Sequence, residues 1–261
     1  MACLRGERYA IPAPPLGTSW PQQPGGRLWP SRPGSAAQRF VALSREAAGS
    51  RGRFSVALSG GSTPGQLYRL LAEEPYNAQI PWAEVHLFWG DERCVPAGDP
   101  GSNFFLAQET LISRVPIPPG NIHRVRGELE PGRAARAYEQ ELQDFFCGPH
   151  ARFDLVLLGL GEDGHTASLF PGSPVLAETA RLVAAATAVY QDRPAQRVTL
   201  TLRAINSARQ ILFLVTGSAK AGVVQAIVEG VDEQLPARRI QPVAGQLTWL
   251  LDAEAARLIG G

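Results

Sequence analysis

The stretch that decides the fold runs from Asp154 to Gly172 and reads DLVLLGLGEDGHTASLFPG. It opens with four consecutive apolar residues, 155–158, which Gly159 follows at once. An apolar run this short, ended by glycine, predicts a strand that is buried on both faces, as in a parallel sheet. Glycines then bring bare backbone to the carboxyl end of that strand, where open α/β sheets bind their ligands.

Two carboxylates and an imidazole, at Glu162, Asp163 and His165, lie among these glycines and form a candidate acid–base group. The glycines also match the G-x-G-x-x-G dinucleotide fingerprint, but that motif belongs in the first βα unit, with an acid roughly 20 residues later. Here it lies past mid-chain, and Asp163 would repel a pyrophosphate at the helix start. A hydrolytic or proton-transfer site with His165 as base is the preferred interpretation, and a solvated histidine in a glycine-rich turn is the alternative.

Composition limits the class of protein. With 261 residues and 44% apolar content, the chain suffices for one α/β domain with a large core. The net charge of +1 implies no nucleic acid or other polyanion as partner. No apolar run is long enough for a membrane span, and no signal-peptide core is evident. Three cysteines without metal-ligand spacing fit a cytoplasmic protein without disulfides.

Lysine usage singles out one position. Of the 25 basic residues, only Lys220 is a lysine and all others are arginine. An ammonium is a compact point charge that suits a phosphate in a tight pocket. Lys220 is also expected in the first turn of a helix, where the helix dipole disfavours a cation unless an anion is held there. The sequence therefore predicts a phosphate contact, with a chance surface lysine as the alternative.

A second chemical loop, SGGST, follows the predicted strand from Phe54 to Leu58. Its two glycines free the backbone, Thr63 is the expected N-cap, and Pro64 is the expected first helical residue. A strand, a hydroxyl-bearing glycine turn and a helix N-terminus together predict an anion site. The loop is neither a Walker A motif nor a nucleophile elbow. An ordinary βα turn is the alternative.

Polar groups also follow the predicted strand from Val85 to Trp89, where Asp91 and Arg93 come next. Ser102 and Asn103 are expected to cap a helix. Residues 197–202 alternate apolar and polar side chains, which predicts a half-buried strand led by Arg197. The alternative for Asp91 and Arg93 is a surface turn, and the alternative for Arg197 is a solvated strand end.

Predicted strands and helices alternate along the chain, which indicates an α/β fold: a doubly wound, mainly parallel sheet with helices on both faces. Residues 1–34 are rich in proline and glycine, and we expect an irregular N-terminal segment there, apart from a short strand at 8–11. Residues 35–261 are expected to form a single domain. Further strands are predicted at 122–125, 155–158, 182–186, 211–215 and 247–251, and helices at 36–48 (capped by Ser35), from 64, around 138–146, from 218 and at 253–259.

Residues 159–171, GLGEDGHTASLFP, closely resemble the signature of the 6-phosphogluconolactonases, whose larger family includes the glucosamine-6-phosphate deaminases. The resemblance runs from about residue 36 to the C-terminus. It includes the blocks SGGSTP at 59–64, DER at 91–93, SN at 102–103 and RVTLT at 197–201. It implies a Rossmann-like domain of the sugar-phosphate isomerase/lactonase type.

The resemblance implies hydrolysis of 6-phospho-D-glucono-1,5-lactone to 6-phospho-D-gluconate, in the oxidative pentose phosphate pathway, without a metal or cofactor. The implied partner is this small sugar-phosphate lactone, for a monomer or small homo-oligomer. The implied catalytic groups are His165 as base, Asp163 as its orienting acid, and Arg93 or backbone N–H groups of the glycine loop at the oxyanion. The implied substrate-binding residues are Gly60, Gly61, Ser62, Thr63, Asp91, Asn103, Gly161, Arg197 and Lys220.

Three other functions compete with the lactonase. A glucosamine-6-phosphate deaminase/isomerase would share the phosphate pocket, but the intact segment 166–171 after the histidine favours the lactonase. A sugar-phosphate-binding protein without turnover would not need His165 with both acids. An NAD-dependent dehydrogenase would require nucleotide binding.

Overall fold

The computed structural model describes residues 28–30, 34–188, 194–230, 232 and 234–259. Its largest element is a six-stranded sheet with the order β1-β9-β8-β5-β2-β3, in which every neighbouring pair is parallel. The strands are β1 (Leu28–Pro30), β2 (Phe54–Leu58), β3 (Val85–Trp89), β5 (Leu155–Leu158), β8 (Gln210–Val215) and β9 (Gln246–Leu251). The predicted parallel sheet is therefore confirmed.

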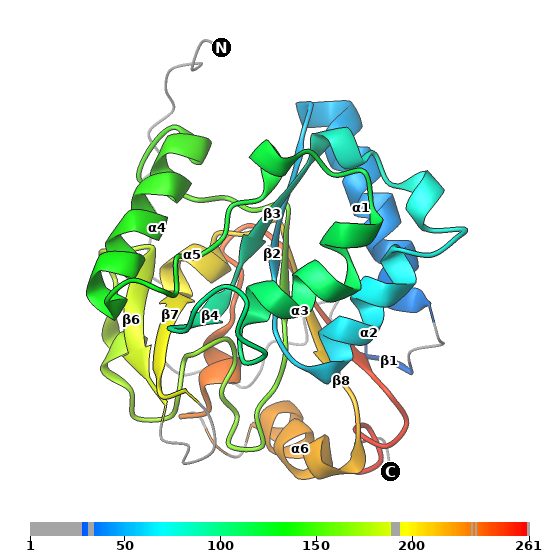
Figure 1. Cartoon of the computed structure of the whole chain (residues 1–261). Coiled ribbons are helices and arrows are strands. Elements are labelled where there is room, and N and C mark those ends of the chain that lie inside the picture. The colour runs from blue at the N-terminus through cyan, green and yellow to red at the C-terminus, as the bar shows by residue number, and fades with distance from the viewer. Residues whose placement is uncertain (1–27, 31–33, 189–193, 231, 233, 260–261) are drawn as a thin grey trace.

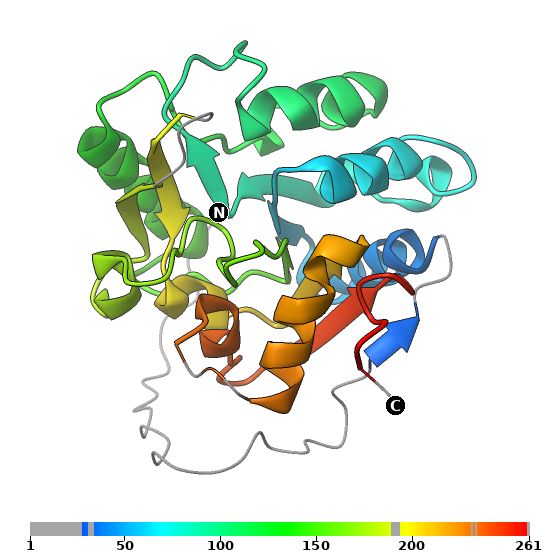
Figure 2. The ribbon, with the colours of Figure 1, turned by 90° about the horizontal axis from the view of Figure 1, so that it is seen from below.

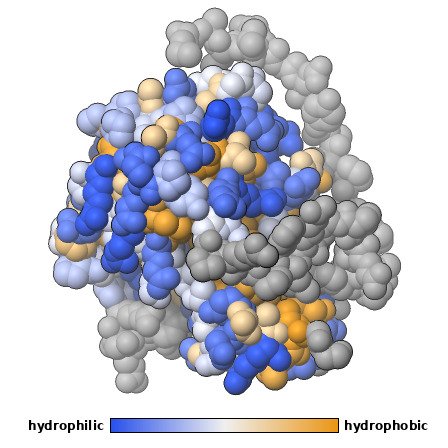
Figure 3. All heavy atoms as spheres, turned by 90° about the vertical axis from the view of Figure 1, so that its right-hand side faces the viewer, coloured by the Kyte–Doolittle hydropathy of each residue, from blue (hydrophilic) through white to orange (hydrophobic). Residues whose placement is uncertain are grey.

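Helices lie on both sides of this sheet, as Figures 1 and 2 show, with α1, α2 and α3 on one side and α4 and α6 on the other. Their bounds are α1 (Ser35–Arg51), α2 (Ser62–Leu71), α3 (Asn103–Thr110), α4 (Pro131–Phe146), α5 (Leu202–Asn206) and α6 (Ala221–Glu229). All residues of β2 and β5 are buried, as expected for strands covered on both faces. No helix in the described part of the chain is long and apolar enough to cross a membrane. Hydrophilic side chains predominate on the face drawn in Figure 3.

A second, three-stranded sheet lies beside the first and was not expected. Its strands are β4 (Asp91–Arg93), β6 (Val183–Thr187) and β7 (Gln196–Leu200), in the antiparallel order β4-β7-β6. Helix α4 packs against β6 and β7. The predicted half-buried strand at 197–202 is wrong in detail, because β7 is buried from Arg197 to Leu200 and α5 already begins at Leu202.

Two predicted elements are absent. Residues 122–125 do not form a strand, because Ile122 makes only an isolated bridge to Leu87. Residues 253–259 form turns instead of a helix. Helix α1 also differs from the prediction: its N-cap is Gly34, so Ser35 is its first residue, and it passes through Gly49 and ends before Gly52.

The N-terminal segment is partly described. Residues 28–30 form β1, which pairs with β9 and supplies an edge strand within the segment that was expected to be irregular. The expected strand at 8–11 lies outside the described residues. The division into segments 1–34 and 35–261 stays a prediction.

Candidate active site

The turn after β5 holds a histidine against an aspartate. His165 Nδ1 and Asp163 Oδ1 lie 2.5 Å apart, and the His165 backbone N–H donates to the same oxygen at 3.1 Å. The turn is closed by two backbone hydrogen bonds, from Gly161 N–H to His165 O (2.8 Å) and from Gly164 N–H to Gly161 O (3.1 Å). Behind it, Ala237 N–H donates to Gly164 O at 3.0 Å. The predicted acid–base pair is therefore formed in a braced turn.

Position 161 must be glycine because the side chains of His165 and Asp163 fill the space beside it. A Cβ atom at this position would lie 2.0 Å from His165 Nδ1 and 2.5 Å from Asp163 Oδ1, so any side chain would push the two apart. Gly164 has φ +77, a left-handed conformation that glycine adopts without strain. The N–H groups of both glycines are used inside the turn, so neither is available to an oxyanion.

The surroundings of Asp163 keep it ionised. Partial burial raises the pKa of Asp163, but the hydrogen bonds from His165 and its charge more than offset this, and the net shift is downward. An ionised Asp163 favours the tautomer of His165 with a proton on Nδ1, which leaves Nε2 as the basic nitrogen. The His165 side chain is 23% exposed and its ring centroid lies 4.9 Å from that of Phe170. The pair is thus oriented and still reachable.

The N-terminus of α2 follows β2 and lacks a side-chain cap. Its N-cap is Gly61, with φ 101, so the prediction that Thr63 caps the helix is wrong. Thr63 lies instead in the first turn, and its Oγ1 is 2.7 Å from Oγ1 of Thr216, which follows β8. With the cap position held by glycine, the first N–H groups of α2 and the Thr63 hydroxyl form the kind of site that binds anions.

Lys220 lies beside the turn that holds His165. It ends the 3-10 turn Ser218–Lys220 just before α6, and its Nζ lies 3.8 Å from Glu162 Oε1. Strands β8, β5 and β2 are consecutive neighbours in the sheet, so the residues that follow them meet at one edge. Figure 1 shows α2, α6 and the loop after β5 together at that edge. The structure therefore brings Thr63, Lys220 and His165 together.

Thr216 was missed in the sequence analysis. Its signal is present, because a hydroxyl directly after the apolar strand β8 occupies the same kind of place as the hydroxyls after β2.

Comparison with known proteins identifies the family of this chain. The family described as Glucosamine-6-phosphate isomerases/6-phosphogluconolactonase matches residues 33–249. The chain belongs to this family. It is 43% identical to a 6-phosphogluconolactonase of Synechocystis sp. over 216 residues, covering 80% of this chain and 86% of the relative. It is 42% identical to the human 6-phosphogluconolactonase over 219 residues, covering 81% and 83%.

A solved structure gives the same result. The 6-phosphogluconolactonase from Trypanosoma cruzi superposes with a TM-score of 0.77 at 32% identity, covering 87% of this chain and 92% of that chain. The resemblance seen in the motifs is thereby confirmed over most of the chain, and the fold with it.

In this member of the family, Asp91 and Asn103 tie elements together. Asp91 Oδ2 accepts from Ser168 Oγ at 2.7 Å, and Asn103 Nδ2 donates to Asp91 O at 2.8 Å and to its Oδ1 at 3.3 Å. A Cβ at Gly60 would lie 1.8 Å from Asn103 Oδ1. The close approach of the SGGST loop (59–63) to α3 therefore requires glycine at position 60. That Asp91 and Asn103 face the sugar hydroxyls stays a prediction.

Glu92, which the sequence analysis did not single out, anchors α3. Its buried carboxylate accepts from the backbone N–H groups of Asn103 and Phe104 and from Ser102 Oγ. Burial raises the pKa of Glu92, and the hydrogen bonds offset this only in part. Ser102 is the N-cap, as predicted, and accepts from Phe105 N–H. The protein's own carboxylate thus occupies this helix N-terminus.

The two predicted arginines face each other in the second sheet. Arg93 in β4 is paired in register with Arg197 in β7, and Arg93 Nη1 donates to Gly101 O at 2.6 Å. Arg197 is only 3% exposed, so the alternative of a solvated strand end is wrong. Their roles, at the oxyanion for Arg93 and at the phosphate for Arg197, stay predictions.

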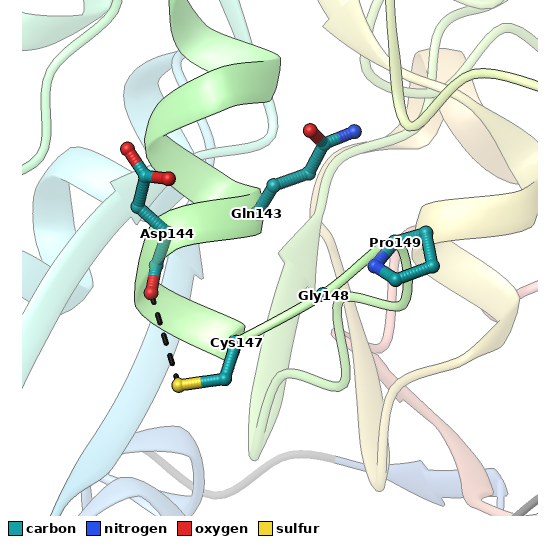
Figure 4. A pocket seen from close by; sticks show the side chains of 5 residues that line it. All are labelled: Gln143, Asp144, Cys147, Gly148 and Pro149. Carbon is teal, nitrogen blue, oxygen red and sulfur yellow. Dashed lines mark hydrogen bonds between the residues drawn. The ribbon is translucent and has the colours of Figure 1, made fainter. Parts of the chain in front are cut away.

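A hollow of about 490 Å³ lies at the end of α4 and is shown in Figure 4. It is lined by Gln143, Asp144, Cys147, Gly148 and Pro149. These residues precede β5, whereas His165 follows it, so the hollow lies toward the opposite edge of the sheet. It lacks a base paired with an acid and a cation, and we do not place the active site there.

Proposed function

We propose that this chain hydrolyses 6-phospho-D-glucono-1,5-lactone to 6-phospho-D-gluconate, as in the oxidative pentose phosphate pathway. The observation that carries the proposal is the His165–Asp163 pair beside Lys220 and the uncapped start of α2. A base and a phosphate-binding site at neighbouring strand ends suit a substrate with a reactive ester at one end and a phosphate at the other. The names of the curated relatives support the same reaction.

The histidine would act as a general base. His165 Nε2 takes a proton from water while the water oxygen forms a bond to the lactone carbonyl carbon. The resulting oxyanion collapses, the bond to the ring oxygen breaks, and that oxygen takes the proton back from the imidazolium. Asp163 holds the ring and stabilises its charge. Proton transfer of this kind accelerates a reaction by about a hundredfold to ten-thousandfold.

Other groups bind the two ends of the substrate. The first N–H groups of α2, the hydroxyl of Thr63 and the ammonium of Lys220 hold the phosphate, with Arg197 as a further predicted ligand. Arg93, or N–H groups of the glycine loop other than those of Gly161 and Gly164, would stabilise the oxyanion. No step requires a metal or a cofactor. A cytoplasmic location and a monomeric or small homo-oligomeric state stay predictions.

The second candidate is the glucosamine-6-phosphate deaminase/isomerase reaction, because the description of the matching family names glucosamine-6-phosphate isomerases beside 6-phosphogluconolactonase, and a solved glucosamine-6-phosphate deaminase is similar to this chain at 25% identity with a TM-score of 0.71. The experiment is a pair of assays on the purified chain. One follows acid release from freshly prepared lactone, corrected for spontaneous ring opening, and the other follows ammonia release from glucosamine 6-phosphate. We expect rapid lactone hydrolysis alone. Ammonia release without lactone hydrolysis would overturn the proposal, and binding without turnover would indicate a sugar-phosphate-binding protein.

A further inference from the structure

We propose that Glu162 lowers the affinity of the site for phosphorylated ligands. Its carboxylate forms an ion pair with Lys220, and a phosphate must displace it in order to bind. The inference rests on the proposed function for the identity of the ligand. It concerns a residue to which the mechanism above assigns no role.

The first support is the ion pair itself. Lys220 Nζ and Glu162 Oε1 are 3.8 Å apart, and the side chains are 24% and 69% exposed. An ion pair this open to water shifts an equilibrium by no more than about fivefold. Such a pair is too weak to be a structural lock, but it is strong enough to compete measurably with a ligand.

The second support is the position of Glu162 on the catalytic turn. The turn is closed at Gly161 and Gly164 and braced from behind by Ala237. Glu162 is exposed at its outer side, while Asp163 is engaged with His165. The side chain of Glu162 can therefore leave Lys220 without disturbing the acid–base pair.

The third support is charge. A phosphate monoester carries about −1.5 to −2 at pH 7, so it outcompetes a single carboxylate for Lys220. Glu162 therefore lowers the affinity for substrate and for product alike, because the phosphate of each must displace the Glu162 carboxylate from Lys220.

The test compares Glu162→Gln with Glu73→Gln, an exposed carboxylate just beyond the far end of α2, which removes the same charge elsewhere. We expect Glu162→Gln to lower the KM for the lactone and the Kd for 6-phosphogluconate by about threefold to fivefold. The gain should shrink at about 1 M salt, where the Debye length is about 3 Å. Glu73→Gln should change neither constant. An unchanged Kd in Glu162→Gln, or an equal gain in Glu73→Gln, would overturn the inference.

A double-mutant cycle separates two effects. One is competition between Glu162 and the ligand for Lys220, and the other is simple repulsion between Glu162 and the ligand. In a Lys220→Gln background, Glu162→Gln should change the Kd for 6-phosphogluconate by less than about 1.5-fold, because the pair is already broken. Equal effects in both backgrounds would overturn the inference. Gluconate, which lacks the phosphate, should gain nothing from Glu162→Gln, and an equal gain would also count against it.

The inference about Glu162 and the proposed function can be refuted independently of each other. If wild-type protein binds 6-phosphogluconate with the expected Glu162 dependence but does not hydrolyse the lactone, the proposed function fails and the inference about the site stands. If the lactone is hydrolysed but Glu162→Gln changes no constant, the inference falls and the function stands.

Discussion

The two ends of β5 carry aspartates with opposite roles. Before the strand, Asp154 is 6% exposed and accepts from Arg51 Nε and from both the N–H and Oγ of Ser55, each at 2.9 Å, with Arg209 Nε at 3.4 Å. After the strand, Asp163 has a side chain that is 43% exposed and is engaged with His165. The first carboxylate is enclosed by partners, and the second is left open to a ligand.

The difference teaches how to tell a structural ion pair from a reactive one. An enclosed carboxylate whose oxygens are all used contributes to folding and can do no chemistry on a substrate. An exposed carboxylate that holds one histidine contributes little to folding but orients a base. Variants at the two ends should therefore separate stability from rate.

The largest effect is expected at the reactive end. His165→Ala should lower kcat by about a hundredfold to ten-thousandfold, because it removes the proposed general base. The KM and the melting temperature should change little, since the ring is partly exposed. Steady-state kinetics and thermal unfolding measure both quantities. A variant that keeps full kcat would refute the base assignment.

Asp154→Ala should have the opposite effect, a loss of stability with little change in kcat. It leaves two arginines and the Ser55 N–H without their carboxylate, and we expect a loss of about 2–4 kcal/mol in the free energy of unfolding. The kcat of the folded protein should stay within about twofold, since Asp154 lies at the far end of the strand. Denaturant unfolding and kinetics check this. A large loss of kcat with normal stability would show that the two ends are not separate.

Lys220→Ala tests the phosphate end of the site. Removal of a charged hydrogen bond should raise the KM at a cost of about 1.5–3 kcal/mol, with kcat nearly unchanged. Lys220→Arg is the matched variant, and it should recover only part of the affinity, because the site suits a compact charge. An unchanged KM in Lys220→Ala would remove this residue from the pocket.

The smallest effect is expected at a titrating group away from the site. His86 Nδ1 lies 3.1 Å from His123 Nε2, near the amino end of β3. Burial, followed by the charges of His123 and Arg53, lowers the pKa of His86 to about 4. The folded protein therefore binds fewer protons than the unfolded chain between about pH 4 and 6.5, so stability falls as the pH falls through this window.

Because His86 is half-buried, we expect this loss to be about 1–2 kcal/mol after allowance for solvent screening. Melting temperatures between pH 4 and 7 measure it. His86→Gln should flatten the profile, whereas His150→Gln, at an exposed histidine, should leave it unchanged. A profile that stays equally steep in His86→Gln would disprove the assignment.

Local patterns were enough for much of the large sheet. Short, mostly apolar runs identified β2, β3 and β5 at their observed bounds, because a largely buried strand has few polar positions: Ser55 in β2, His86 in β3 and none in β5. The cap at Ser102 was also predictable, since its hydroxyl meets an N–H three residues on. The caps at Ser35 and Thr63 were wrong, because Gly34 and Gly61, with φ of 95 and 101, take the N-cap position in each helix.

The second sheet could not be predicted. It pairs β4 with β7, about a hundred residues later, and no local pattern reports a pairing over that distance. The buried anchor Glu92 was missed for a similar reason, since the partners that join it to α3 begin ten residues away and are mostly backbone N–H groups.

The groups proposed to do the chemistry can be found from the local sequence alone: glycines beside an acid and an imidazole, a hydroxyl-rich turn and a single lysine, each in the segment that follows an apolar strand. Which of these groups meet was decided only by the strand order β8-β5-β2, which places three distant loops side by side. The physical reason is that backbone conformation and residue type act over a few neighbours. Contacts such as Thr63 with Thr216 and Lys220 with Glu162 exist only once the sheet has formed.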